Sequence, residues 1–332
     1  MRAAVVGVGA VGARVARQLL STPGLEALCV ADTNRARADA VARSLGSPAR
    51  VTELTPEVLA QCDVVVLATP GSHRAHAEAA LEHGVHVVSL TGDIAEVKNL
   101  LDLDAEARER DLTVVVGAGF SPGLSCVLAR HAAQGLDAVD EVHVATFGTA
   151  GPSCARAHRR AMVADALDWV DGAWSRPGGG GARELVWFPD PVGGRDCCHA
   201  GLPDSLLVAP AFPGVRRVTA RLACSRVERL TALVPRPRPR MVEGQVGAVR
   251  VEVRGRRGGA TDVHVLGAID RPALAAGAVA AVAATFVAEG RLGRSGAAGL
   301  AELVDDSVPF LQDLSARGVR AARFEGSGTP AV

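Results

Sequence analysis

The 332-residue sequence predicts an α/β fold in two parts. The first part is expected to be a doubly wound parallel sheet, and the second an α+β domain with an open, mostly antiparallel sheet. Three observations lead to this prediction. Short apolar strands alternate with amphipathic helices over the first third of the chain, a glycine-rich turn follows the first strand, and strand-like runs follow one another in the second half.

The first third contains six predicted strands with helices between them. The fourth strand is apolar after its first residue, as expected of a strand that is covered on both faces. This alternation is typical of the Rossmann type of doubly wound sheet. The strands are expected at residues 2–6, 25–31, 50–52, 63–68, 85–90 and 112–116, and the helices at residues 11–20, 35–45, 56–60, 73–83 and 94–110.

The turn after the first strand matches the dinucleotide-binding pattern G-x-G-x-x-G. Gly7 permits a tight turn, Gly9 lets the backbone approach a pyrophosphate, and Gly12 lets the helix pack closely on the strand. The start of the following helix offers N–H groups and the positive end of a dipole to the phosphates. The cofactor-binding residues expected here and at the end of the second strand are Gly7, Gly9, Ala10, Val11, Gly12, Asp32 and Thr33.

The choice between NAD and NADP depends on the end of the second strand. Asp32 can accept both hydrogen bonds from an adenosine ribose, and a carboxylate repels a 2′-phosphate, so this residue favours NAD. Asn34, Arg35 and Arg37 follow at once. An arginine there could accommodate the 2′-phosphate, and NADP therefore stays open.

The carboxyl ends of the later strands are expected to form the reacting face, because ligands of such sheets lie there. Further cofactor contacts are predicted at Ala68, Thr69, Pro70, Thr91, Gly119, Phe120 and Ser121. Asp93 and His73 are the catalytic candidates, since each is an ionisable group at the start of a helix beside this face. The alternative role of Asp93 is to cap the helix that follows it.

Composition excludes several classes of chemistry. The chain has no tyrosine, so no tyrosine can act as the acid, and Lys98 is its only lysine. The 36 basic residues balance the 36 acidic ones, so nucleic acid and membrane surfaces are not expected partners. The seven cysteines show no CxxC spacing, and no apolar stretch reaches ~18 residues. We expect a cytoplasmic protein with reduced thiols and no metal site.

The second half is predicted to hold the substrate-binding and dimerisation domain, with a homodimer as the assembly. The domains are expected at residues 1–135, with about 271–325 packing back onto them, and at residues 136–270. A proline-rich connection is expected at residues 235–240 and a loose tail at residues 326–332. Strands are predicted at residues 139–147, 185–188, 215–222, 227–233, 248–253 and 262–269, and helices at residues 155–169, 272–289 and 304–314.

Four stretches resemble the saccharopine dehydrogenase-like oxidoreductases, in the branch related to carboxynorspermidine and homospermidine synthases. They are residues 7–12, residues 68–77, residues 88–93 and above all residues 117–125, which read Gly-Ala-Gly-Phe-Ser-Pro-Gly-Leu-Ser. The resemblance covers about the first 135 residues. It implies nicotinamide-dependent chemistry at a C–N bond, either reduction of an imine or the reverse oxidation of an amine.

The resemblance also implies a small substrate that carries a carboxylate. Arginine binds a carboxylate with two parallel hydrogen bonds, which lysine cannot do. The substrate-binding candidates are Arg156, His158, Arg159, Arg160, Arg195 and His199.

Two alternatives stay open. The chain also resembles the glucose-fructose oxidoreductase-like sugar dehydrogenases, which share the fold and the pattern of a proline followed by a His-Ala helix. Their usual Glu-Lys-Pro after the fifth strand is replaced here by Ser89-Leu90-Thr91, which places this resemblance second. The other alternative is a dinucleotide-binding sensor without catalysis, because no unmistakable acid/base pair stands out in the sequence.

Overall fold

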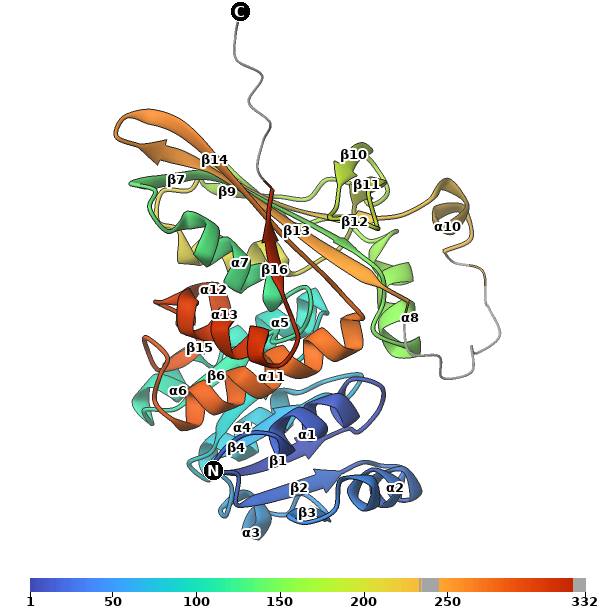
Figure 1. Cartoon of the computed structure of the whole chain (residues 1–332), viewed down its shortest axis with the longest axis vertical. Helices are drawn as coiled ribbons and strands as arrows, with labels where there is room; N and C mark the ends of the chain where they lie inside the picture. Colours follow the sequence, from blue (N-terminus) through green and yellow to red (C-terminus); the bar gives the residue numbers. More distant parts are fainter. Residues whose placement is uncertain (233, 235–244, 325–332) are drawn as a thin grey trace, which may run out of the picture.

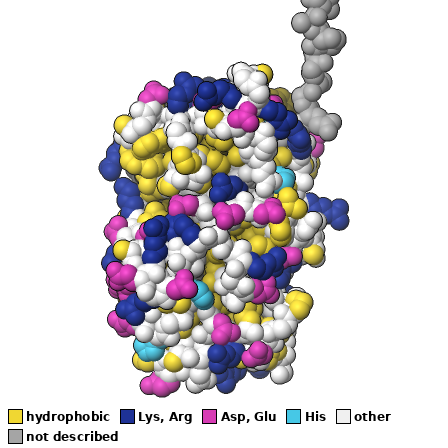
Figure 2. Space-filling model, turned by 90° about the vertical axis from the view of Figure 1, so that its left-hand side faces the viewer, with side chains coloured by type: hydrophobic (Ala, Val, Ile, Leu, Met, Phe, Trp, Pro, Cys, Tyr) yellow, Lys and Arg dark blue, Asp and Glu magenta, His cyan; other side chains and the backbone are white. Residues whose placement is uncertain are grey.

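The computed structural model describes residues 1–232, 234 and 245–324. Two sheets lie one above the other, with a layer of helices that includes α7 (Leu124–Ala133) and α11 (Pro272–Ala288) between them (Figure 1). The predicted proline-rich connection and the predicted tail lie outside the described residues. On the face shown in Figure 2, basic and acidic side chains are intermingled, as the balanced composition leads one to expect.

The first sheet has seven parallel strands in the order β15-β6-β5-β4-β1-β2-β3. Its central strands are buried along their whole length, which explains their continuous runs of valine. This confirms the predicted doubly wound sheet. The strands are β1 (Arg2–Val6), β2 (Ala27–Ala31), β3 (Ala49–Val51), β4 (Val64–Leu67), β5 (His86–Ser89), β6 (Thr113–Val116) and β15 (Gly296–Ala298).

The helices of this part follow the predicted order, with one difference. The predicted helix at residues 94–110 is two helices, α5 (Ile94–Leu101) and α6 (Asp104–Glu109). The break lets the Asp104 carboxylate accept a hydrogen bond from the Ala297 N–H in β15, at 2.9 Å. The remaining helices are α1 (Gly12–Leu20), α2 (Arg35–Leu45), α3 (Pro56–Leu59) and α4 (Arg74–Glu82).

The second sheet has nine strands and is mostly antiparallel, as predicted. Its path is β10-β11-β12-β7-β13-β14-β16, and only the β12–β7 pair runs parallel. The strands are β7 (Ala138–Phe147), β8 (Asp168–Val170), β9 (Ala173–Ser175), β10 (Glu184–Trp187), β11 (Gly194–His199), β12 (Arg217–Ala223), β13 (Gly247–Arg257), β14 (Ala260–Asp270) and β16 (Ala321–Arg323).

Two predicted elements of the second part are wrong. The helix expected at residues 155–169 is α8 (Pro152–Ala161), which begins where Pro152 suits the first turn, and the segment after it forms β8. The strand expected at residues 227–233 is α10 (Arg226–Leu230) as far as the described residues reach. Ser225 and Glu228 form a reciprocal capping box there, which favours a helix over a strand.

The C-terminal segment returns to the first part of the chain. Gly277 of α11 lies against α1 so closely that a Cβ atom there would stand 2.7 Å from the Arg14 Cβ. The predicted helix at residues 304–314 is α13 (Ser307–Ala316), and a short helix that was not predicted, α12 (Leu300–Leu303), precedes it. Although α11 is buried on nearly all sides, neither it nor any other helix in the described part of the chain is long and apolar enough to cross a membrane.

Candidate functional site

The cofactor crevice lies where the strand order of the first sheet reverses, between β1 and β4. The loop of residues 7–12 leaves β1 there, next to Thr69 at the end of β4. Gly7 has a φ of +87°, and a Cβ atom on it would stand 2.7 Å from the Thr69 Cγ2. A Cβ atom on Gly12 would stand 1.8 Å from the Gly7 carbonyl oxygen. By contrast, Gly9 faces open space, with no atom within 4 Å of its Cβ position.

These positions fit a dinucleotide. The close approach of α1 to β1 requires glycine at both ends of the loop, and the open space over Gly9 leaves room for a pyrophosphate at the start of α1. The loop is braced from the neighbouring strand, because the Asp32 Oδ2 accepts a hydrogen bond from the Val8 N–H at 2.9 Å. The predicted loop residues Ala10 and Val11 lie on the exposed side of the same turn, and neither is fully buried.

The predicted ribose-binding carboxylate is close to an arginine. The Asp32 Oδ1 accepts a hydrogen bond from the Asn34 N–H at 2.8 Å, and the Arg37 Nη1 lies 3.4 Å from the Asp32 Oδ2. The Asp32 side chain is 5 % exposed and the Arg37 side chain 43 % exposed. Thr33 is exposed beside them. Both groups that the sequence proposed for distinguishing NAD from NADP therefore lie together at the edge of the crevice.

His73 is buried, at 1 % exposure, and both of its ring nitrogens have partners. The Nδ1 lies 2.8 Å from the Ser89 Oγ, and the Nε2 lies 2.9 Å from the Thr69 carbonyl oxygen. Burial is the main cause that lowers the pKa of His73, against the opposing effects of Thr69 and Glu96. A neutral imidazole enclosed in this way suits a role in holding Thr69 at the crevice rather than direct contact with a substrate.

Asp93 takes the alternative role considered for it. It is exposed, and its Oδ1 accepts hydrogen bonds from the Ala95 N–H at 2.9 Å and the Glu96 N–H at 3.1 Å, which caps α5. Glu96, which the sequence analysis did not single out, reaches from α5 to the start of α4. Its buried carboxylate accepts hydrogen bonds from the His73 N–H at 2.6 Å and the Arg74 N–H at 3.0 Å. This contact joins two of the loops that border the crevice.

A carboxylate from the second part of the chain reaches the loop after β6. Asp204 begins α9 (Asp204–Val208) and is fully buried. Its Oδ1 accepts hydrogen bonds from the Ser121 Oγ at 2.8 Å and the Ser125 Oγ at 2.6 Å. Its Oδ2 is buried without a hydrogen-bond partner. Burial raises the pKa of Asp204, and the hydrogen bonds from both serines oppose that rise.

The loop that carries these serines is tightly closed. The Gly119 N–H donates to the Pro122 carbonyl oxygen at 2.9 Å, and a Cβ atom on Gly123 would stand 2.2 Å from the Gly119 carbonyl oxygen. The predicted contact residues Phe120 and Thr91 are buried nearby in the two strand ends, whereas Pro70 is exposed at the end of β4. The glycine-rich signal of residues 117–125 is thus a rigid turn that presents Ser121 to the second domain.

The start of α8 lies against the cofactor loop. Gly151 caps this helix, and a Cβ atom on it would stand 2.9 Å from the Ala10 Cβ. One turn further on, the Cys154 Sγ lies 3.6 Å from the His158 Nε2. Both side chains are partly exposed. We call Ser121, Ser125, Cys154, His158 and Asp204 the crevice cluster; the sequence analysis named only Ser121 and His158 among them.

The other predicted substrate residues separate into two groups. Arg156 and Arg160 lie on the exposed side of α8, where the Arg156 Nη2 donates to the Ser153 Oγ at 2.9 Å. Arg159 is half-buried next to His158, and no ion pair of its side chain is found within the described residues. Among the three arginines of this helix, Arg159 is therefore the least exposed.

Arg195 and His199 lie elsewhere. Together with Cys197, they occupy every second position of β11, so their side chains lie on one face of that strand. The Arg195 guanidinium lies 5.1 Å from the centre of the Phe147 ring. Phe147 belongs to the face of β7 opposite to Val144, which packs in the core shared with the first sheet. These two residues are thus on the outer face of the second sheet, and the structure does not bring them together with the crevice.

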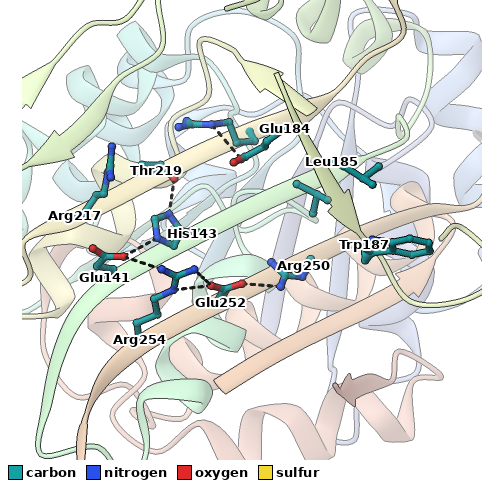
Figure 3. A pocket seen from close by; sticks show the side chains of 12 residues that line it. Glu141, His143, Glu184, Leu185, Trp187, Arg217, Thr219, Arg250, Glu252 and Arg254 are labelled. Carbon is teal, nitrogen blue, oxygen red and sulfur yellow. Dashed lines mark hydrogen bonds and ion pairs between the residues drawn. The ribbon is translucent and has the colours of Figure 1, made fainter. Parts of the chain in front are cut away.

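The outer face also holds a pocket of about 390 Å³ (Figure 3). The charges in it pair with one another. The Glu252 carboxylate accepts hydrogen bonds from Arg250 at 2.6 Å and Arg254 at 2.7 Å, and His143 lies 3.2 Å from the Glu141 Oε2. We call these five residues the outer-face network. Within the described residues, no group of three or more His, Cys, Asp or Glu side chains is placed to hold a metal ion.

The first part of the chain matches a known protein family. Residues 1–118 match the family model described as GFO/IDH/MocA, the oxidoreductase family with an NAD-binding Rossmann fold. The match supports the second resemblance stated above at least as well as the first. It covers six of the seven strands of the parallel sheet, the glycine loop and the strand ends up to residue 118.

Similar folds occur among solved structures. Apo saccharopine dehydrogenase (L-Glu forming) from Saccharomyces cerevisiae is 14% identical, with a TM-score of 0.70, over 98% of this chain and 100% of that chain. A probable dehydrogenase from Thermotoga maritima is 11% identical, with a TM-score of 0.51, over 97% and 98%. UDP-N-acetylglucosamine 3-dehydrogenase GnnA from Acidithiobacillus ferrooxidans is 19% identical, with a TM-score of 0.50, over 96% and 95%. These likenesses concern the fold. Residues 1–118 thus match an NAD-binding Rossmann domain, and NAD or NADP is the cofactor, as predicted.

Proposed function

We propose that the protein is an NAD(P)-dependent oxidoreductase that acts on a C–N bond of a small substrate carrying a carboxylate. The reaction is the reduction of an imine to an amine, or the reverse oxidation. The cofactor supplies or accepts the hydride when it is bound. The residues of the chain itself have to orient the substrate, hold its carboxylate and handle one proton at its nitrogen.

The observation that carries this proposal is the kind of ionisable group gathered at the crevice. Oxidation of an alcohol needs a base that removes the hydroxyl proton. The position where sugar dehydrogenases place a lysine is occupied here by Leu90, and the chain has no tyrosine. A protonated imine is instead a cation, which a nearby carboxyl or thiol group in its anionic form stabilises. Asp204 and Cys154 are such groups.

The substrate carboxylate is proposed to bind Arg159. This side chain follows directly after His158 on α8, and a guanidinium can hold a carboxylate with two hydrogen bonds. Binding there would place the rest of a small substrate between α8 and the loop that carries Ser121. Holding two reactants in this way supplies much of the rate of a hydride transfer.

The sugar-dehydrogenase alternative is supported by the family match of residues 1–118. One panel of assays separates the two functions. The full chain is incubated with NADH or NADPH and pairs of amines or amino acids with 2-keto acids or aldehydes, and separately with NAD or NADP and a set of sugars and polyols. We expect cofactor oxidation with an amine–carbonyl pair. Turnover of polyols alone would overturn the C–N proposal, and tight cofactor binding without any turnover would favour a sensor.

The assembly is tested separately. The homodimer expected from the sequence stays a prediction, and light scattering of the full chain measures it directly.

A further inference from the structure

Cys154 differs from the other cysteines of the chain. The remaining six are buried, whereas Cys154 is partly exposed, in the first turn of α8. Gly151, which caps the helix, lies so close to the cofactor loop that a Cβ atom on it would stand 2.9 Å from the Ala10 Cβ. A thiolate near a helix N-terminus is stabilised by the backbone N–H groups and the helix dipole. The position alone would be weak evidence, but a second group meets the thiol there.

That second group is the imidazole of His158. The 3.6 Å between the Cys154 Sγ and the His158 Nε2 is a hydrogen-bonding distance for sulfur, and a spacing of four residues sets both side chains on one face of the helix. The titratable group on the neighbouring element that acts on this pair is Asp204 of α9. The serines that bind Asp204 belong to the loop after β6, so the pair is connected to the reacting face of the first sheet.

The electrostatics favour the ionic form of the pair. Burial alone would raise the pKa of the Cys154 thiol, but the charge and the hydrogen bond of His158 more than offset this and lower it. Burial alone would lower the pKa of His158, but the charge and the hydrogen bond of Cys154, together with the charge of Asp204, raise it. Both shifts move one proton from sulfur toward nitrogen.

We propose that Cys154 and His158 are the proton-handling pair of this site and lie against the substrate nitrogen. This inference rests on the proposed C–N chemistry. In the direction of reduction, the pair gives its shared proton to the lone pair of the imine nitrogen, which forms an N–H bond. The hydride of the reduced cofactor then forms the new C–H bond, and the π electrons of the C=N bond become the lone pair of the amine. The pair is left as thiolate and neutral imidazole and takes up a proton from water.

The first test measures the thiol without any assay of turnover. The folded full chain is treated with iodoacetamide between pH 5 and 10, and the labelled peptide is identified by mass spectrometry. We expect one reactive cysteine, Cys154, and the pH midpoint of its labelling rate should lie below the ordinary thiol pKa of about 8.5. In His158→Asn the midpoint should rise toward that value, and saturating NADH should slow the labelling several-fold. A midpoint near 8.5 that His158→Asn leaves unchanged would overturn the pair.

The second test measures turnover of the substrate found by the assay panel. Cys154→Ala and His158→Asn should lower kcat by about 10²–10⁴-fold, the usual contribution of a positioned acid or base. The serine hydroxyl of Cys154→Ser is a far weaker acid than a thiol. This variant should therefore lose its turnover at neutral pH but still bind NADH. Ala157→Gln, an exposed position on the same helix, is the matched control and should keep wild-type kcat. Circular dichroism and NADH binding establish that each variant is folded.

The two proposals fail in different ways. The Cys154 labelling could have a low pH midpoint and be slowed by NADH in a protein that turns over no combination of amine and carbonyl. That result would retain the Cys154–His158 pair and overturn the C–N reaction. Full turnover of an imine in Cys154→Ala and His158→Asn would retain the reaction and remove the pair.

Discussion

The crevice cluster and the outer-face network each bring a histidine together with at least one carboxylate, but their groups are partnered differently. On the outer face, the Glu252 carboxylate lies between two arginines and the Glu141 carboxylate lies beside His143, so each acidic group has a basic partner, although the Arg250 Nε is buried without a hydrogen-bond partner. At the crevice, the Asp204 Oδ2 is buried without a partner. A carboxylate with basic partners is compensated for its burial, whereas an unpaired buried oxygen is retained at a cost of about 1–3 kcal/mol.

The difference shows which polar cluster is suited to chemistry. The outer face holds a pocket of about 390 Å³, yet the charged groups of the outer-face network that line it are paired with one another (Figure 3). The crevice cluster leaves hydrogen-bonding capacity unused and lies against the cofactor loop through Gly151. The presence of a pocket is therefore a poorer guide in this molecule than the pairing of the groups that line it.

The largest expected effect comes from exchanging one carboxylate in each cluster. Asp204→Asn keeps an oxygen that can accept from Ser121 and Ser125 but removes the charge, and we expect kcat to fall by about 10²–10³-fold, as for loss of one electrostatic stabiliser. Glu252→Gln should leave kcat unchanged, since it lies on the opposite face of the second sheet. Steady-state kinetics of both variants measure the contrast. Equal losses in the two variants would abolish the distinction between the clusters.

Cofactor choice should respond to Asp32. Asp32→Ala removes the carboxylate that is predicted to bind the ribose and leaves Arg37 without its ion-pair partner. We expect NAD binding to weaken by about 10–100-fold, or about 1.4–2.8 kcal/mol, and NADP binding much less. Calorimetric titration of both nucleotides measures this. A loss of the same size for NADP would mean that Asp32 braces Val8 and does not distinguish the two cofactors.

The contact between the helix and the loop should be sensitive to one methyl group. Gly151 has a φ of +149°, and an added Cβ atom would stand 2.9 Å from Ala10. Gly151→Ala should move the start of α8 away from the crevice and lower kcat/KM by about tenfold, because misplacement of about 1 Å is costly in catalysis. Gly172→Ala, also at positive φ but facing open space, is the control for backbone strain. An equal fall of kcat/KM in both variants would remove the role given to this contact.

The smallest effects concern stability against pH, and the two carboxylates should act in opposite directions. The folded-state pKa of Asp204 is raised, mainly by burial. Its contribution to the free energy of unfolding is therefore complete below about pH 3.9 and is lost as the pH rises through the folded-state pKa. Burial would also raise the pKa of Glu252, but hydrogen bonds from Arg250 and Arg254 lower it. Its contribution is present above about pH 4.3 and is lost as the pH falls.

Denaturant unfolding of the wild type and the two variants between pH 3 and 8 measures these contributions. Relative to the wild type, Asp204→Asn should gain stability as the pH rises. Glu252→Gln should be less stable by about 1–3 kcal/mol at neutral pH, and this deficit should shrink in acid. The stability of each variant relative to the wild type could instead change with pH in the same direction. That result would contradict the different partnering of the two carboxylates.

The sequence predicted the first sheet well because its signals are local. A strand, a glycine turn and the next helix lie within a few residues, and Asp32 follows on the neighbouring strand. β15 escaped prediction because its three residues, Gly-Ala-Ala, carry no strand signal of their own. The strand predicted over α10 was wrong because its apolar residues were weighed more heavily than the capping box of Ser225 and Glu228.

The site was harder to predict because its contacts are distant in sequence. The partners of Asp204 lie 79 and 83 residues before it, and nothing in the local pattern around Asp204 announces them. Arg195 and His199 were chosen by residue type, and the alternation of β11 places them on the outer face. The sequence analysis named Ser121 and His158 of the crevice cluster, but it did not use the spacing of four residues between Cys154 and His158, which sets both side chains on one face of α8.

Hydrogen–deuterium exchange of the full chain with and without NADH tests directly whether the crevice cluster, and not the outer-face network, faces the cofactor. We expect slower exchange in peptides that contain residues 7–12, 117–125 and the first two turns of α8, and unchanged exchange in β7 and β13. Protection of β7 and β13 with none at α8 would contradict the placement of the reacting site between the two domains.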